Sequence, residues 1–354
     1  MRMDDGMAAQ PSMRQRQMSD DTVNADSPHA ADAGAVLVAV PLSPFVTWLR
    51  LIRPAALLLV LLPALTALAL LWVRSARIHA LPAISGLISL TLVQAGASLL
   101  DVYLEYARRA RLPDSDRYDL LTARALLAHS GAPPLNVLRV SIALLALGAL
   151  VGIPLVVSGG WSVVLLGVVG LAIAFLFSAT AFALKRFSLA DLLVGLALGP
   201  GIITGMMLAQ RHSPTGRDLL LGCALGLLAM LPAVGAHLRD AQQDKALGRR
   251  TLVTTLGDGV GRAIYALCLL AGFALLVFAA LPRGAPHGAL LGFFALPAFS
   301  TPLTGVFRAK PGRAREQIVL QELRAYAVFG FWLLLGLAIN AMLISGLGPI
   351  PPTV

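Results

Sequence analysis

Charged residues are scarce in this 354-residue sequence, in which Asp, Glu, Lys and Arg make up 13% and hydrophobic residues 57%. Soluble globular domains carry about 25% charged residues, so the composition excludes that class and indicates a bundle embedded in a lipid bilayer. Cysteine is also nearly absent. Cys223 and Cys268 lie inside apolar segments, where we expect small core residues that carry no redox information.

Long apolar runs recur along the chain. A helix needs about 20 apolar residues to cross a hydrocarbon core of about 30 Å, because each residue rises only about 1.5 Å. We therefore expect an all-α integral membrane protein of about nine transmembrane helices, at roughly 55–73, 81–104, 136–156, 161–182, 189–209, 218–238, 263–281, 286–306 and 325–346.

Polar composition is confined mainly to the N-terminus. Residues 1–44 are rich in Asp, Ser, Met and Ala, which predicts a disordered tail that is dispensable for chemistry. Residues 45–347 form the transmembrane domain, and 348–354 form a short C-terminal tail.

The distribution of charge predicts the orientation. Of the 28 Lys and Arg residues, 20 lie before the first helix or in loops after even-numbered helices, and five lie in the opposite loops. Basic loops stay cytoplasmic, so the N-terminus is expected inside, in a multi-pass protein of the inner (cytoplasmic) membrane. Outside the tail, every acidic residue except Asp218 falls on the same side. This indicates a polar site there, although solvated loops could account for about half of these charges.

The segment from Ala236 to Gly257 carries the most informative pattern, AHLRDAQQDKALGRRTLVTTLG. Asp240 and Asp244 are four residues apart, so on a helix they lie one turn apart on the same face. Two such carboxylates repel unless a cation lies between them, and oxygen ligands favour Mg²⁺. The alternative is a solvated helix end at which both aspartates pair with nearby basic side chains: Arg239, Lys245, Arg249 and Arg250.

A second acidic pair occurs at the end of the second predicted helix, GASLLDVYLEYARRARLPDSDRYD. Asp101 and Glu105 are again four residues apart and are again followed by basic residues. Both pairs end even-numbered helices, four helices apart, which is typical of a duplicated four-helix unit. Two acidic rims that face each other could hold two Mg²⁺ ions and thereby a diphosphate, while Arg and Lys neutralise the remaining phosphate charge.

Three motifs resemble those of the UbiA superfamily of intramembrane prenyltransferases, nearest to its 1,4-dihydroxy-2-naphthoate prenyltransferase-like members. RDAQQDKALGRRTL, residues 239–252, is similar to the second aspartate motif of that family, RDxxxDxxxGKxTL. WLRLIRP, at 48–54, is typical of the segment that leads into the first helix. LKRFSLADLLVGLALGPGIITG, at 184–205, is similar to the stretch that ends in GP and G in the naphthoate branch.

Two positions depart from the family. Where relatives read LANDYFDY, this chain reads LLDVYLEY at 99–106, so Asp101 replaces Asn, Val102 replaces the first Asp and Glu105 replaces the second. Ala236 and His237 stand where the naphthoate branch has paired asparagines. His237 is either a polar group of the pocket or a solvated cap at a helix end.

The resemblance implies a nine-helix bundle with a cytoplasmic polar pocket and a lateral opening to lipid. It implies Mg²⁺-dependent transfer of a prenyl group from a polyprenyl diphosphate to an aromatic, quinone-precursor-like or lipid acceptor. Asp240, Asp244 and Glu105 would bind Mg²⁺, with Asp101 as a further ligand. The diphosphate would contact Arg239, Lys185 and the loop residue Arg117, which follows Asp114 and Asp116. Lys185 also fits a simple anchor at the membrane surface. We expect membrane lipids, and no nucleic acid, among the partners.

Three alternatives remain open. A degenerate family member would bind prenyl diphosphate without turnover, which is suggested by Val102 in the first motif. A transporter would carry ionisable residues near the bilayer midplane, whereas these stand at helix ends. A phosphatidyl-type transferase would carry DGxxAR, but DGVGRA at 258–263 has its arginine one place early. The sequence leaves the acceptor and the prenyl length unspecified, because pocket shape sets both.

Overall fold

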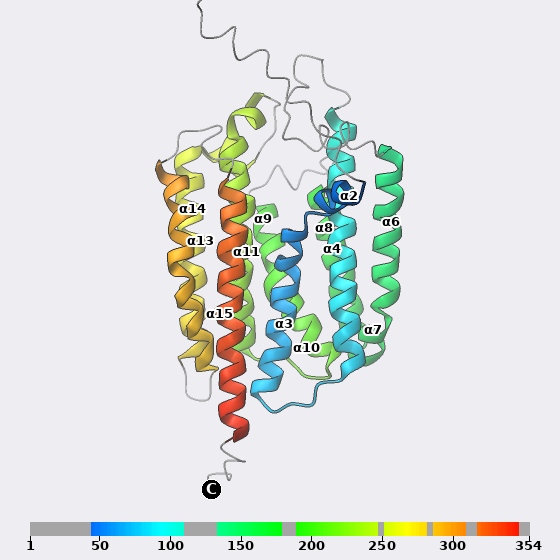
Figure 1. The fold of residues 1–354 in the computed structure, drawn as a ribbon, viewed down its shortest axis with the longest axis vertical. Coiled ribbons are helices and arrows are strands. Elements are labelled where there is room, and N and C mark those ends of the chain that lie inside the picture. The colour runs from blue at the N-terminus through cyan, green and yellow to red at the C-terminus, as the bar shows by residue number, and fades with distance from the viewer. Residues whose placement is uncertain are drawn as a thin grey trace, which may run out of the picture. The chain divides into compact units, whose positions relative to one another are not determined.

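The computed structural model describes residues 44–109, 133–178, 189–246, 251–281, 286–308 and 317–346. The chain divides into two units, Met1–Leu42 and Ser43–Val354, and the first lies outside the described residues, as does the predicted C-terminal tail. In the described part, every regular element is helical (Figure 1): α2 Pro44–Ile52, η1 Pro54–Leu57, α3 Leu58–Val73, α4 Ala80–Arg109, α6 Pro134–Val151, α7 Ile153–Gly159, α8 Trp161–Ser178, α9 Leu189–Leu196, η4 Ala197–Gly201, α10 Ile202–Ala209, α11 Gly216–Ala246, α12 Leu252–Leu256, α13 Asp258–Ala280, η5 His287–Ala295, α14 Leu296–Arg308 and α15 Ile318–Gly346.

Most of these helices are long and apolar enough to span a membrane. Within the described ranges, eight spans correspond to eight of the predicted runs: Pro54–Val73, Ala80–Leu104, Pro134–Gly159, Asp191–Ala209, Gly216–Gln242, Asp258–Ala280, His287–Arg308 and Ile318–Ile344. The ninth run, predicted at 161–182, contains a shorter apolar helix, Trp161–Ile173. The all-α, multi-pass membrane class is therefore confirmed. The total of about nine spans and the orientation of the N-terminus stay predictions.

The segment before the first span docks on α4. Leu51 of α2 packs in an apolar cluster with Leu99 and Val102 of α4. Arg53 follows in the left-handed region, with φ of 55°, and Pro54 begins the next helical turn. Proline suits a first helical position because its missing N–H would have no intrahelical partner there. The chain thus turns sharply into α3 and leaves Arg53 beside α4.

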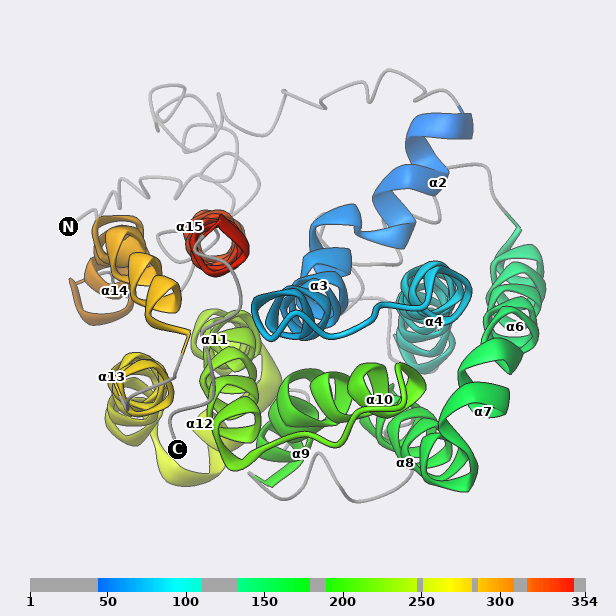
Figure 2. The ribbon, with the colours of Figure 1, turned by 90° about the horizontal axis from the view of Figure 1, so that it is seen from below.

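The two helices that carry the acidic motifs, α4 and α11, run toward the same end of the bundle (Figure 1). We call it the motif end, and the other the far end. α3 and α10 each contact both α4 and α11. In the view along the bundle, α3 and α10 lie between the two motif helices (Figure 2). The two acidic pairs therefore lie at the same end of the bundle, as the prediction of two facing acidic rims requires.

Close helix packing depends on the glycine-rich stretch from α9 to α10. Pro200 lies inside the π-helical turn η4, where a wider turn accommodates a residue without an N–H. Gly199 of η4 presses directly on α11, because a Cβ atom there would lie 2.1 Å from the carbonyl oxygen of Gly222. Gly199 therefore lets the backbones of η4 and α11 come into direct contact. Gly205 makes no such close contact, because a Cβ atom there would meet nothing nearer than 4.0 Å.

The Gly199→Ala substitution is expected to destabilise the bundle by about 1–3 kcal/mol or more, since the added methyl group can only be accommodated by separating two backbones. Gly205→Ala, a few residues further along the same run, is the matched control and should unfold like the wild type. Thermal unfolding of both variants in one detergent checks this. Equal melting temperatures would contradict the close approach.

Candidate active site

The second acidic motif lies on an unbroken helix. α11 extends to Ala246, beyond the predicted end at 238, so Asp240 and Asp244 do lie one turn apart on one face. Their surroundings differ. Asp244 is only 5% exposed, whereas about a third of the Asp240 side chain is accessible. Asp244 is therefore not a solvated residue at a helix end, in contrast to the alternative considered from the sequence.

Asp240 is paired within its own motif. Arg239 donates from Nε to Asp240 Oδ1 at 2.6 Å and from Nη2 to Oδ2 at 2.8 Å. This two-pronged contact is one of the ion pairs expected from the alternative in which the aspartates pair with nearby basic side chains. Because about a third of each side chain is exposed, the pair is accessible to a ligand at the motif end.

The first acidic motif also has a basic partner. Arg53 Nη1 lies 3.2 Å from Asp101 Oδ2, which ties the segment after α2 to α4. Glu105 follows one turn later on α4. Val102 is 1% exposed and packs with Leu51, Leu99 and Val137. The position where relatives have their first aspartate therefore faces an apolar cluster formed with α2 and α6.

The structure brings these groups to one end of the bundle but not into one cluster. Among the described residues, no group of three or more His, Cys, Asp or Glu side chains is close enough to hold a metal ion. Lys185 and Arg117, predicted to contact the diphosphate, lie outside the described residues, as do Asp114 and Asp116.

A further polar pair lies beside the second motif. Asp191, in the first turn of α9, is 3% exposed, and its Oδ2 is 3.3 Å from Nδ1 of His237 on α11. His237 is an interior residue of a 31-residue helix, so it is not a cap. Asp191 was not among the site residues predicted from the sequence, although a carboxylate in an apolar membrane helix is itself a signal because it needs a partner.

One acidic residue near the motif end is buried. Glu322 of α15 is fully buried, and a Cβ atom on Gly235 of α11 would lie 3.2 Å from its Oε1. The charge pattern had placed Glu322 with the other acidic residues on one face. Its carboxyl group instead lies in the packing between α11 and α15.

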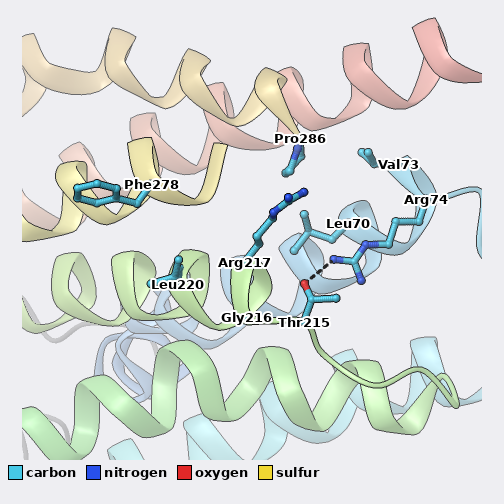
Figure 3. A pocket seen from close by; sticks show the side chains of 9 residues that line it. All are labelled: Leu70, Val73, Arg74, Thr215, Gly216, Arg217, Leu220, Phe278 and Pro286. Carbon is cyan, nitrogen blue, oxygen red and sulfur yellow. Dashed lines mark hydrogen bonds between the residues drawn. The ribbon is translucent and has the colours of Figure 1, made fainter. Parts of the chain in front are cut away.

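The opposite end of the bundle contains a cavity of about 680 Å³ (Figure 3). Its walls are mainly apolar, with Arg74, Thr215 and Arg217 as the polar lining. Asp218 caps the start of α11 by accepting from the Thr215 N–H at 2.6 Å, and it pairs with Arg74. None of the motif residues lines this cavity, so the candidate site remains at the motif end.

Membership of a family follows from the sequence as well as the fold. The chain matches the model of the UbiA prenyltransferase family over residues 60–323, about three quarters of its length, and it belongs to this family. It is accordingly an enzyme of the prenyltransferase class. Among its relatives, 1,4-dihydroxy-2-naphthoate octaprenyltransferase of Bacillus subtilis (strain 168) is 22% identical over 293 residues, which cover 82% of this chain and 92% of the relative. The enzyme of the same name from Mycobacterium tuberculosis (strain ATCC 25618 / H37Rv) is 27% identical over 161 residues, 46% of this chain and 54% of the relative.

Solved structures share the fold. A UbiA homolog from Archaeoglobus fulgidus bound to GPP and Mg²⁺ has a TM-score of 0.60 at 16% identity, over 84% of this chain and 99% of that one. A digeranylgeranylglyceryl phosphate synthase has a TM-score of 0.54 at 12% identity, over 84% of this chain and 99% of that one. These likenesses confirm a UbiA-type helical bundle.

Proposed function

We propose that this enzyme transfers a prenyl group from a polyprenyl diphosphate to an aromatic, quinone-precursor-like acceptor within the membrane, and that it requires Mg²⁺. One observation carries the proposal: Asp240 and the buried Asp244 lie one turn apart on α11, beside Arg239, at the end of the bundle that α4 shares. The Archaeoglobus homolog with GPP and Mg²⁺ supports the donor and the metal, and the naphthoate enzymes support the acceptor.

The residues at the motif end fit a magnesium site. Carboxylate oxygens are the ligands Mg²⁺ prefers, and Asp240, Asp244, Glu105 and Asp101 would hold it. Asp244 is only 5% exposed, and a carboxylate at such a buried position would be stabilised by a bound cation. Bound Mg²⁺ would neutralise the charge that develops on the departing diphosphate.

Basic side chains complete the leaving-group site. Arg239 already makes a planar, two-pronged contact with a carboxylate, and the same guanidinium geometry suits a phosphate. We assign it to the diphosphate together with Lys185 and Arg117. The apolar surface of the spans would keep water from the allylic carbon, so that the acceptor reacts in place of water.

The membrane setting follows the charge pattern. We place the motif end at the cytoplasmic face of the inner membrane, where a water-soluble diphosphate head and a lipid-soluble prenyl tail can both be accommodated. A lateral opening between helices would admit the tail from the bilayer.

An acceptor panel tests the reaction class. The purified full-length protein is given a radiolabelled polyprenyl diphosphate with 1,4-dihydroxy-2-naphthoate, 4-hydroxybenzoate or a lipid alcohol at fixed Mg²⁺. We expect an acceptor-dependent product with an aromatic acceptor and none with the lipid alcohol. Product from the lipid alcohol alone would overturn the aromatic assignment, and no product from any acceptor would favour the degenerate binder suggested by Val102.

A further inference from the structure

His237 occupies the same face of α11 as the two motif aspartates. Positions 237, 240 and 244 follow the i, i+3, i+7 spacing of one helical face. With a rise of about 1.5 Å per residue, His237 lies about 4.5 Å along the axis from Asp240, on the side away from the motif end. An allylic carbon attached to a diphosphate at Asp240 would therefore lie near the level of His237.

α9 covers this face just below the motif. Gly195 packs against Met230 and Gly226 of α11, so α9 approaches closely enough for Asp191, one turn earlier, to reach His237. Small residues at such crossings let helix backbones come close together. The Asp191–His237 contact is thus fixed by the packing of two helices rather than by a loop.

The two side chains are unequally accessible. The side chain of Asp191 is 4% exposed and that of His237 is 19% exposed, so His237 is the member of the pair that a ligand can touch. Nδ1 faces Asp191 at 3.3 Å without the alignment of a hydrogen bond, and Asp191 Oδ1 has no hydrogen-bond partner among the described residues. The other ring nitrogen, Nε2, is the one left for a ligand.

From this arrangement we infer that Asp191 and His237 form the acceptor-binding half of the site, an inference that rests on the proposed function. His237 hydrogen-bonds a hydroxyl group of the acceptor, and Asp191 is a positioning residue that holds the ring. The ligand class is a hydroxylated aromatic.

A matched pair of ligands tests the contact without turnover. Binding of 1,4-dihydroxy-2-naphthoate and of its dimethyl ether is measured on the full-length protein without Mg²⁺ or prenyl diphosphate. The wild type is expected to prefer the dihydroxy compound about three- to tenfold, the range of one hydrogen bond. His237→Leu should abolish the preference. Asp191→Asn, which keeps the shape of the side chain, should weaken it, and His212→Leu at the far end should leave it unchanged.

Steady-state kinetics supply the second readout. His237→Leu should raise KM for the acceptor about three- to tenfold and leave KM for the prenyl diphosphate and the Mg²⁺ requirement unchanged. If His237→Leu misfolds, His237→Asn replaces it, with a smaller loss expected because the amide can still accept. A retained preference for the dihydroxy compound, or a rise in the diphosphate KM alone, would overturn the inference. A wild type that binds with this preference but makes no product would overturn only the proposed function.

Discussion

Asp240→Asn and Asp244→Asn are each expected to reduce prenyl transfer to below about one hundredth of the wild-type rate, because removing one ligand from a shared metal clamp disables the whole clamp. Neither change should prevent folding. Asn has nearly the same shape as Asp, and the ion pair that Asp240 makes with Arg239 is partly exposed, so its loss should cost at most about 1 kcal/mol. Transfer rates and melting temperatures measured on the same preparations check both expectations.

Asp258→Asn is the matched control for this pair. Asp258 also lies at the motif end of the bundle, at the start of α13 (Figure 1). It pairs with Arg262, one turn later, at 2.6 Å. It lies outside both acidic motifs, so its loss should leave transfer within about twofold of the wild type, as expected for a surface change. Normal turnover in Asp240→Asn or Asp244→Asn would contradict the assignment of the second motif.

Glu105→Gln is expected to cost as much activity as Asp244→Asn. If the altered first motif works, Asp101 and Glu105 supply two carboxylates one turn apart on α4, and the extra methylene of Glu lets its carboxylate reach the ion from a slightly retracted backbone. Transfer by the purified variant at fixed Mg²⁺ measures the effect. Activity close to the wild type would indicate that the first motif no longer takes part.

The buried position of Val102 determines the result that we expect from its substitution. Val102→Asp restores the family residue, but the new carboxylate would be buried against Leu51, Leu99 and Val137. Burying an unpaired charge costs several kcal/mol, so we expect a lower melting temperature and no gain in transfer. An inactive wild type that becomes active on Val102→Asp would contradict this account and support the degenerate binder.

The sequence predicted the helices well because hydrophobic length alone specifies membrane spans. The runs at 55–73 and 263–281 differ from the observed spans by only a few residues. The run predicted at 218–238 covers the apolar part of α11, and the last turns of this helix are polar. They remain helical through Ala246, which places Asp240 and Asp244 on a rigid element.

The environment of single side chains was harder to predict, because it depends on which helices become neighbours. Asp191 acquires a partner only when α9 packs on α11, and nothing in the local sequence of either helix specifies that contact. Glu322 is buried because Gly235 leaves room for its carboxyl group. Val102 faces an apolar cluster because α2, a segment ahead of the first span, docks there. Spacing along one helix predicted the acidic pairs, but contacts between helices could not be predicted in this way.

The most direct test of the central claim is the Mg²⁺ dependence of transfer from a radiolabelled polyprenyl diphosphate to 1,4-dihydroxy-2-naphthoate by the purified full-length protein. We predict that EDTA abolishes product formation, that added Mg²⁺ restores it in the wild type, and that Asp240→Asn stays below about one hundredth of the wild-type rate under either condition. Product formation undiminished by EDTA, or restored equally in Asp240→Asn, would contradict a magnesium diphosphate site at the motif end.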